Sequence, residues 1–570
     1  MRVRSLHPAW LVLILVAILV VTASGVALSA LPVSRSSAPL SMSATSSSSG
    51  SVVVGAFTQE TPISPAFWGI NIAAAQRFNS VDAASVAATP VSYLVFPAGN
   101  LGEEYNYTSG VVTQVDGSQS LSQVSAQEFV TNCESFKCKA IMQLPTEIDR
   151  PATAAVYAAY VVHTLGYQPA YWQLGNDPGG WSHYKVPWAN WKADSDGNTT
   201  PVQFATEVQA YIGTVLTVDP SAKFLALGMG MGGKDYAKPW VEQLASVDGH
   251  LLSGIALHSY ALGGSPSAPT DDELLANLNG VYSIPAQVTA DRQYIKDACS
   301  SCTKLSIFIT EANAAEDSSL TKLLPTFVGT LYLAVDTVQG LASQVTNLDW
   351  FAYDSGYSGS WSQHPQKWQM QYYLFSDIMT HLENETLPTT VTGPSSFYGM
   401  ATYDKSGEAL LLVNVNTTTQ VSASLSKAGF IIGRAGVTEY SWVDGSEQPT
   451  KSSITLSSTL KIPALSIILL TVGGAGTQSP DATGFALAPL VGGALTSSVV
   501  RVGSLGLTVA VSSMGAGIPL FVLGVLPFSR KGRAEFGGRR RAVGSRPSSG
   551  PVDETARHMR GPDRGRSRSP

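Results

Sequence analysis

The chain has 570 residues, of which 44% are hydrophobic and only 13% charged, and its formal net charge is −6 at pH 7. This length allows several domains and one large core. Arginine residues concentrate in 530–570, so the rest of the chain is distinctly acidic, which argues against nucleic acid as a partner.

The first 51 residues are typical of an export signal followed by a spacer. Arg2 and Arg4 precede the wholly uncharged run Ala9–Leu31, which predicts a secretory signal peptide or a signal anchor over residues 1–31. Serine dominates residues 32–51. Because such a stretch cannot bury enough apolar surface to fold, we expect it to be a flexible linker.

Between residues 52 and 394, short apolar runs alternate with helical patterns. One expected strand ends just before Asn176, and others are Val91–Phe96, Ala140–Leu144, Phe224–Leu227, Ile255–Leu257, Leu305–Thr310 and Leu348–Tyr353. Helices are expected over Pro151–Leu165 and Leu320–Val338, among others. This alternation is typical of a parallel sheet, and about eight repeats favour a closed (β/α)8 TIM barrel over an open sheet. Catalytic residues of such barrels lie at the carboxyl ends of the strands.

The C-terminal third of the chain has a different pattern. Residues 395–473 contain short apolar runs divided by Gly, Asn and Ser, which predicts a small antiparallel β-sandwich. Residues 474–501 are expected to be a linker, and the uncharged stretch 502–529 a transmembrane helix. The Arg-rich residues 530–570 would then be a cytoplasmic tail, and the body would be anchored at the cell surface, facing outward.

Four cysteines occur in two close pairs, Cys133/Cys138 and Cys299/Cys302. A Cys-x-x-Cys spacing occurs in redox and zinc sites, but the eight histidines form no cluster that would complete a zinc site. Two local disulfides in an exported protein are therefore the favoured interpretation. We expect no metal and no cofactor.

Two of the expected strands are followed directly by a carboxylate. Asp177 follows the fourth strand and Glu311 the seventh, and hydrolysis of a glycosidic bond needs two such groups. Asn176 is placed to hydrogen-bond a sugar 2-hydroxyl, and Tyr260 to donate to Glu311. His258 is interpreted as structural or substrate-lining. Exposed aromatic faces suit sugar stacking, and the candidates are Trp181, Trp350 and Tyr353.

These motifs resemble the retaining glycoside hydrolases of clan A. The segment Trp172–Pro178 resembles the Asn-Glu-Pro acid/base motif of that clan, Ile309–Glu311 its nucleophile and His258–Tyr260 its strand-six segment. Phe67–Asn71 and Ile462–Ile468 resemble the family 79 type, which includes heparanase and β-glucuronidases. The resemblance implies Glu311 as nucleophile, Asp177 as acid/base, and an oligo- or polysaccharide substrate.

The chain also departs from this pattern. Asp177 stands where the clan has Glu, and Glu147 and Asp149, at the end of the third strand, are possible substitute acids. Leu94–Gly99 lacks the arginine often found there, which affects the substrate contacts expected from this segment. Two alternatives therefore stay open. One is a non-catalytic surface protein that binds glycans or other proteins with a degenerate barrel, and the other is a purely structural envelope protein.

Overall fold

The computed structural model describes residues 46–473 apart from 56–58, 75–77, 104, 108, 114–118, 123, 147–149, 181–199, 231–235, 261–269, 303, 315–325, 354–361, 364–366, 369, 406 and 428–436. It also describes 498–502, 507–514 and 518–522. The predicted signal segment 1–31 and basic tail 530–570 lie outside the described residues, as does most of the linker predicted over 474–501.

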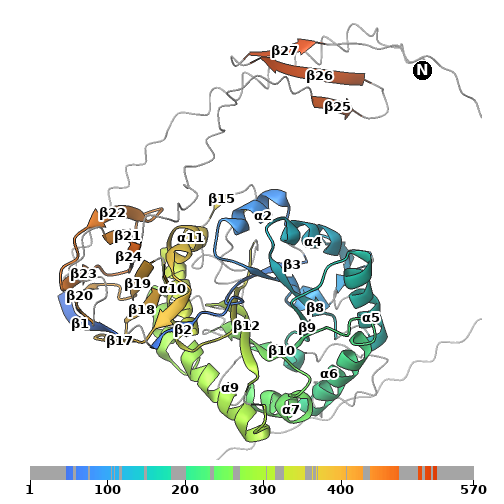
Figure 1. Cartoon of the computed structure of the whole chain (residues 1–570), viewed down its shortest axis with the longest axis horizontal. Helices are drawn as coiled ribbons and strands as arrows, with labels where there is room; N and C mark the ends of the chain where they lie inside the picture. Colours follow the sequence, from blue (N-terminus) through green and yellow to red (C-terminus); the bar gives the residue numbers. More distant parts are fainter. Residues whose placement is uncertain are drawn as a thin grey trace, which may run out of the picture. The chain divides into compact units, whose positions relative to one another are not determined.

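Eight parallel strands close into a barrel, with helices on its outside (Figure 1). The last strand pairs with the first, so the predicted (β/α)8 barrel is confirmed. In chain order the strands are β3 (Trp68–Ala73), β4 (Tyr93–Ala98), β8 (Lys139–Leu144), β9 (Tyr171–Leu174), β10 (Phe224–Gly230), β11 (Gly254–Tyr260), β12 (Ser306–Asn313) and β13 (Asn347–Trp350).

The helices follow the strands along the chain, and local signals fix several of their ends. Pro151 and Pro201 occupy first-turn positions, and Thr200 forms a capping box with Gln203. The helices are α2 (Ser80–Ala87), α3 (Asn100–Glu103), α4 (Ala126–Ser135), α5 (Pro151–Ala159) with its extension η2 (Tyr160–Thr164), η3 (Pro178–Gly180), α6 (Pro201–Val215), α7 (Lys238–Asp248), α8 (Asp271–Ala276), η4 (Asn277–Asn279), α9 (Ile284–Ala298), α10 (Phe327–Ala342), α11 (Met370–Tyr373), η6 (Leu374–Ile378) and η7 (Met379–His381).

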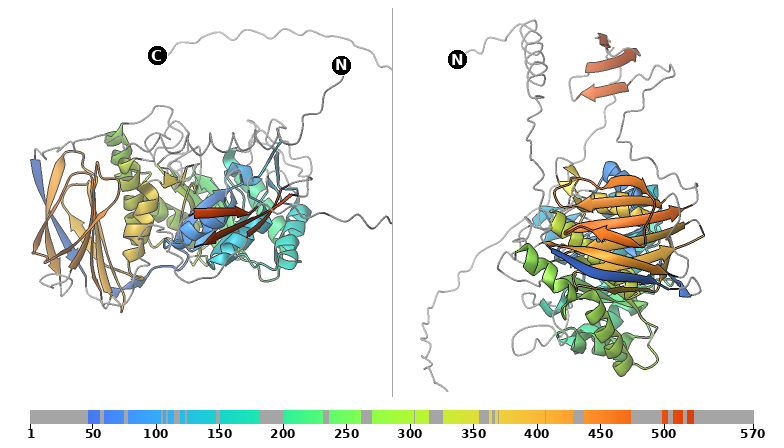
Figure 2. Two further views of the ribbon diagram at one scale, coloured as in Figure 1. Left: turned by 90° about the horizontal axis from the view of Figure 1, so that it is seen from above. Right: turned by 90° about the vertical axis from the view of Figure 1, so that its left-hand side faces the viewer.

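Two sheets form the β-sandwich beside the barrel (Figure 2). One contains β17 (Thr389–Thr392), β1 (Ser46–Val54), β20 (Thr419–Lys427) and β23 (Thr459–Ile462). The other contains β2 (Thr61–Pro62), β16 (Glu385–Leu387), β18 (Phe397–Tyr403), β19 (Gly407–Asn414), β24 (Ser466–Gly473), β21 (Val437–Val443) and β22 (Thr450–Ile454). Smaller sheets pair β5 (Tyr105–Asn106), β6 (Val111–Thr113) and β7 (Gln119–Leu121), and β14 (Ser362–Gln363) with β15 (Lys367–Trp368).

Strand β24 joins the sandwich to the barrel. Its side chains alternate, so Ile467 and Leu469 belong to the same core as the barrel, whereas Ile468 and Leu470 face the interior of the sandwich. Phe327 of α10 packs against Trp442 of β21 with ring centroids 5.3 Å apart. An apolar strand with two buried faces explains why this segment contains no polar alternation.

The predicted domain boundaries are wrong at the N-terminal side. Ser46–Val54 forms β1, which pairs with β17 and β20, so these residues belong to the sandwich. The linker expected over 32–51 thus ends in a strand, and the barrel domain expected from residue 52 begins at β3. Val52 and Val54 are buried and hold the strand in register, and tertiary pairing overrides its serine-rich composition.

Both predicted disulfides are present. Cys133 is bonded to Cys138 between α4 and β8, and Cys299 to Cys302 between α9 and β12. Both bridges lie near the amino ends of barrel strands, which is the end opposite to the predicted catalytic residues.

The predicted helix over 502–529 is not found in the described part of that segment. Three antiparallel strands occur there instead, in a unit separate from the rest: β25 (Ser498–Val502), β26 (Leu507–Met514) and β27 (Ile518–Val522). Among the described residues, no helix has the length and hydropathy needed to cross a bilayer.

Candidate active site

The two predicted catalytic carboxylates lie at the carboxyl ends of barrel strands. Asp177 follows β9, the fourth strand, and Glu311 lies on β12, the seventh. His258 and Tyr260 lie on β11, the sixth strand, where His258 pairs in register with Glu311. The fold therefore brings these four residues to one end of the barrel, as the sequence predicts.

Glu311 is 5% exposed and is oriented by a short hydrogen bond. The Tyr260 hydroxyl donates to Oε2 of Glu311 at 2.6 Å. Hydrogen bonds from a neutral hydroxyl to a carboxylate are shorter and stronger than those between neutral groups. This contact favours an ionised Glu311 in a fixed orientation, which is what attack on an anomeric carbon requires.

Asp177 is more accessible and its backbone is unusual. Its φ is +48°, in the left-handed region that Asp and Asn tolerate better than most residues. Its N–H donates to the Gly228 carbonyl at 2.5 Å, and its Oδ1 accepts from the Gly230 N–H at 3.3 Å. The side chain is 29% exposed, so a substrate can reach the carboxyl group.

His258 lies between the two carboxylates. Its Nδ1 is 3.3 Å from Asp177 Oδ1 and 3.6 Å from Glu311 Oε2. The two oxygens can be no further apart than these distances placed end to end, about 6.9 Å. Retaining glycosidases hold their carboxyl groups about 5–5.5 Å apart and inverting enzymes about 6.5–9.5 Å. The bound on this one pair of oxygens is compatible with the retaining arrangement.

Asn176 is buried and tied to a residue that the sequence analysis did not select. Its Nδ2 donates to Asn100 Oδ1 at 2.9 Å and to Asp177 Oδ2 at 3.3 Å. Asn100 begins α3, and Glu103 at the end of α3 accepts from the Thr146 N–H at 2.6 Å. The sequence could have indicated Asn100, because this residue directly follows the segment Leu94–Gly99 at the carboxyl end of the second strand.

Asp349 is a second residue that the sequence analysis did not select. It is fully buried inside the barrel, and its Oδ1 accepts from Asn347 Nδ2 at 3.0 Å. Burial, with the nearby charge of Glu311, raises the pKa of Asp349 well above its usual value. Gly69 makes room for it, because a Cβ at Gly69 would lie 1.3 Å from Asp349 Oδ1.

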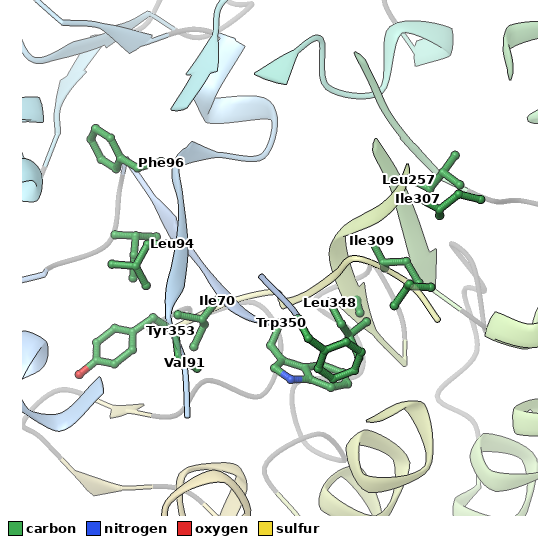
Figure 3. Close-up of a cluster of buried hydrophobic side chains, with 14 of the residues drawn as sticks. Ile70, Val91, Leu94, Phe96, Leu257, Ile307, Ile309, Leu348, Trp350 and Tyr353 are labelled. Atoms are coloured by element: carbon green, nitrogen blue, oxygen red, sulfur yellow. The ribbon is translucent and has the colours of Figure 1, made fainter. Parts of the chain in front are cut away.

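Trp350 and Tyr353 were predicted to stack on a sugar, and the structure contradicts this for both. Trp350 is 3% exposed and packs toward the helices, with its ring 5.8 Å from that of Phe375. Tyr353 is 1% exposed, and its hydroxyl donates to Asp82 Oδ1 at 3.0 Å. Figure 3 shows both in a cluster of buried hydrophobic side chains. Trp181, Glu147 and Asp149 lie outside the described residues.

The described residues contain no group of three or more His, Cys, Asp and Glu side chains suited to a metal ion. A cavity of about 110 Å³ lies between β2, β16 and the C-terminal end of α10, and its lining, which includes Thr61, Phe67 and Leu341, is uncharged. It contains none of the four residues at the carboxyl ends of the strands, so it adds nothing to this site.

Comparison with known proteins identifies the fold. No model of a known protein family matches the chain, and no curated protein sequence matches it. Similar solved structures include the GH51 arabinofuranosidase from Xanthomonas axonopodis pv. citri, with 14% identity and a TM-score of 0.61 over 74% of this chain and 99% of that one. The α-L-arabinofuranosidase from Thermotoga maritima is 14% identical, with a TM-score of 0.59 over 75% and 100%.

A Paenibacillus polymyxa xyloglucanase from glycoside hydrolase family 44 is also similar, with 12% identity and a TM-score of 0.57 over 75% of this chain and 100% of that one. The names of these neighbours identify them as arabinofuranosidases and a family 44 glycoside hydrolase. At such identities the likeness shows that the chain shares the barrel fold of these proteins and nothing finer.

Proposed function

We propose that this protein is a glycoside hydrolase that cleaves O-glycosidic bonds of oligo- or polysaccharides with retention of configuration. The observation that carries the proposal is the pair Asp177 and Glu311, held at the carboxyl ends of strands four and seven with no more than about 6.9 Å between the oxygens that face His258. The glycosidase fold is consistent with this chemistry but does not by itself assign it.

In the proposed mechanism, Asp177 protonates the leaving oxygen while Glu311 attacks the anomeric carbon and forms a covalent glycosyl-enzyme. Asp177, now a carboxylate, takes a proton from water, which attacks the anomeric carbon and releases Glu311. Tyr260 holds the nucleophile through its 2.6 Å hydrogen bond. Asn176, fixed by Asn100, lies beside Asp177, where it can bond the 2-hydroxyl of the sugar.

We also propose that the catalytic body acts outside the cell, at its surface. Support comes from the two disulfides, which persist in oxidising compartments, and from Arg2, Arg4 and the uncharged run behind them. The finer resemblance to the family 79 type rests on Phe67–Asn71 and Ile462–Ile468 and stays a prediction.

The stereochemical course tests the proposal. Aryl glycosides of gluco, galacto, xylo and arabinofuranosyl configuration would be hydrolysed inside an NMR tube, and the first anomeric proton to appear would be recorded. We expect the first sugar product to have the same anomeric configuration as the substrate, and Glu311→Gln to show no turnover. Release of the opposite anomer, or equal turnover by Glu311→Gln, would contradict the mechanism.

A non-catalytic glycan-binding protein is the second candidate, and Asp177 is the observation that favours it. The carboxyl group of Asp177 lies about 1.5 Å further back than that of a Glu would, and such a displacement can be costly in a catalytic site. A folded protein that binds glycans but cleaves none of the panel would support this candidate.

A further inference from the structure

The carboxyl group of Asp177 borders open space at the end of β10. The Gly230 N–H donates to Asp177 Oδ1 at 3.3 Å, and a Cβ at Gly230 would meet no atom of the described residues within 4 Å. Such a Cβ lies about 2.5 Å from its own nitrogen, so the space begins within about 6 Å of the carboxyl oxygen. The structure therefore leaves room for a bound group directly beside the proposed acid/base residue.

An exposed tyrosine lies next to the turn that carries Asp177. Of the Phe, Tyr and Trp side chains whose burial the structure describes, only Tyr236 and Tyr282 are exposed, by 49% and 39%. A Cβ at Gly179, two residues after Asp177, would lie 2.5 Å from the Tyr236 hydroxyl and 2.9 Å from Met229 Cε. Placed end to end, these distances put the two atoms no more than about 5.4 Å apart. Both atoms therefore converge on the turn that follows Asp177.

Packing fixes the position of Tyr236. The next residue, Ala237, is buried, and Trp240 in the first turn of α7 packs against Phe204 of α6 with ring centroids 5.9 Å apart. The core therefore holds the backbone of Tyr236, while its hydroxyl lies against the turn at Gly179. A ring that is fixed at both ends loses little conformational freedom when a ligand packs against it, which favours binding.

The side of Asp177 on which these residues lie indicates what they can bind. Gly179 follows β9 and Gly230 ends β10, whereas Glu311 lies on β12, two strands beyond β10. In a retaining mechanism the nucleophile attacks the anomeric carbon from the side opposite to the leaving group, and the acid protonates the leaving oxygen. A group bound beside Asp177 on the β10 side is therefore the leaving group, and not the sugar that Glu311 attacks.

Sugar rings and aryl groups pack well on exposed aromatic faces. We propose that Tyr236 is the platform of the leaving-group subsite, and that the space beside Gly230 admits the ring whose oxygen Asp177 protonates. This subsite rests on the proposed glycosidase function and makes it more specific, because a sugar or aryl ring becomes the preferred leaving group. Tyr236 also supplies the exposed aromatic side chain that Trp350 and Tyr353, both buried, do not provide.

Different leaving groups on one sugar test the assignment in the full-length protein. A glycosyl fluoride releases an ion too small to reach Tyr236, whereas an aryl glycoside and a disaccharide of the same sugar each release a ring. For Tyr236→Ala we expect kcat/KM to fall about tenfold on the two ring substrates, because stacking on the aromatic face is lost, and by much less on the fluoride. Tyr236→Phe keeps the ring and should keep most of the activity. Tyr282→Ala, at the other exposed tyrosine, is the control.

Gly230→Val tests the space beside Asp177 independently. The backbone of Gly230 is not in the left-handed region and its Cβ position is open, so valine should fit without strain. The valine side chain should obstruct the leaving group, so we expect kcat/KM to fall severalfold or more on the ring substrates and much less on the fluoride. Gly213→Val, at an exposed glycine of α6 whose Cβ position is equally open, is the matched control and should change neither activity.

The outcomes separate this assignment from the proposed function. Equal losses on the fluoride and on the ring substrates would show that Tyr236 supports Asp177 and not the leaving group, and would overturn the assignment. Full activity of both Tyr236→Ala and Gly230→Val on the ring substrates would overturn it as well. A parent protein that hydrolyses neither the fluoride nor the ring substrates would instead refute the proposed function, and the leaving-group subsite with it.

Discussion

Tyr260→Phe tests whether the orientation of Glu311 matters for catalysis. The substitution removes one hydroxyl and leaves the ring, so it abolishes the 2.6 Å hydrogen bond that this hydroxyl donates to Oε2 of Glu311. Glu311 is 5% exposed, so water cannot readily replace the donor. A hydrogen bond to a charged group contributes roughly 1.5–3 kcal/mol, and about 1.4 kcal/mol corresponds to a factor of ten in rate.

We therefore expect kcat/KM of Tyr260→Phe to fall roughly 10- to 150-fold on the best aryl glycoside of the panel, mostly through kcat. Initial rates measured across substrate concentrations separate the two parameters. Tyr282→Phe, at an exposed tyrosine before α9, is the control and should change nothing. If Tyr260→Phe keeps activity within twofold of the parent while folding normally, the assignment of Tyr260 as the residue that positions the nucleophile is refuted.

Three further predictions concern the acid/base residue, the buried carboxyl groups and the barrel interior. Asp177→Ala should lose far more activity on substrates with poor leaving groups than on activated aryl glycosides. Azide attacks without a general base, so adding it should restore turnover of Asp177→Ala and give a glycosyl azide of retained configuration as the product. No rescue by azide would contradict the role of Asp177. Burial raises the pKa of Asp291 to about 7, so the folded protein binds the proton of this carboxyl group more tightly than the unfolded chain does. Asp291→Asn should therefore raise the free energy of unfolding, measured with urea at pH 7.5, by on the order of 2–4 kcal/mol, but should not raise it at pH 4. Gly69→Ala would place a Cβ 1.3 Å from Asp349 Oδ1 and should destabilise the fold by about 1–3 kcal/mol, with Asp349→Ala relieving the loss; a neutral Gly69→Ala would refute this packing.

The barrel and its catalytic end could be predicted because the signals for them are local. A buried strand must be apolar, so a strand that ends at Asn176 and Asp177 marks the rim of the sheet, and the same holds before Glu311. The alternation of strands with helices then fixes which rim residues share one end. The relation between His258 and the two carboxylates was not predictable, since it depends on register across three strands.

The wrong predictions have physical causes of a different kind. Ser46–Val54 has the composition of a linker, but pairing with β17 and β20 makes it a strand. The uncharged stretch 502–529 resembles a membrane helix by hydropathy alone, and hydropathy without a clear period does not distinguish a helix from short apolar strands. Trp350 faces the helices because side chains alternate along a strand and its neighbour Asp349 faces inward.

Covalent trapping of the nucleophile is the most direct test of a retaining mechanism. The full-length protein would be incubated with cyclophellitol-type epoxides of several sugar configurations, followed by intact mass measurement and peptide mapping, with Glu311→Gln as the control. We predict the mass of one label per chain, located on Glu311 and absent from Glu311→Gln. A folded protein that hydrolyses a glycoside while the label is found on another carboxylate, or is retained in Glu311→Gln, would contradict the assignment of Glu311 as the nucleophile.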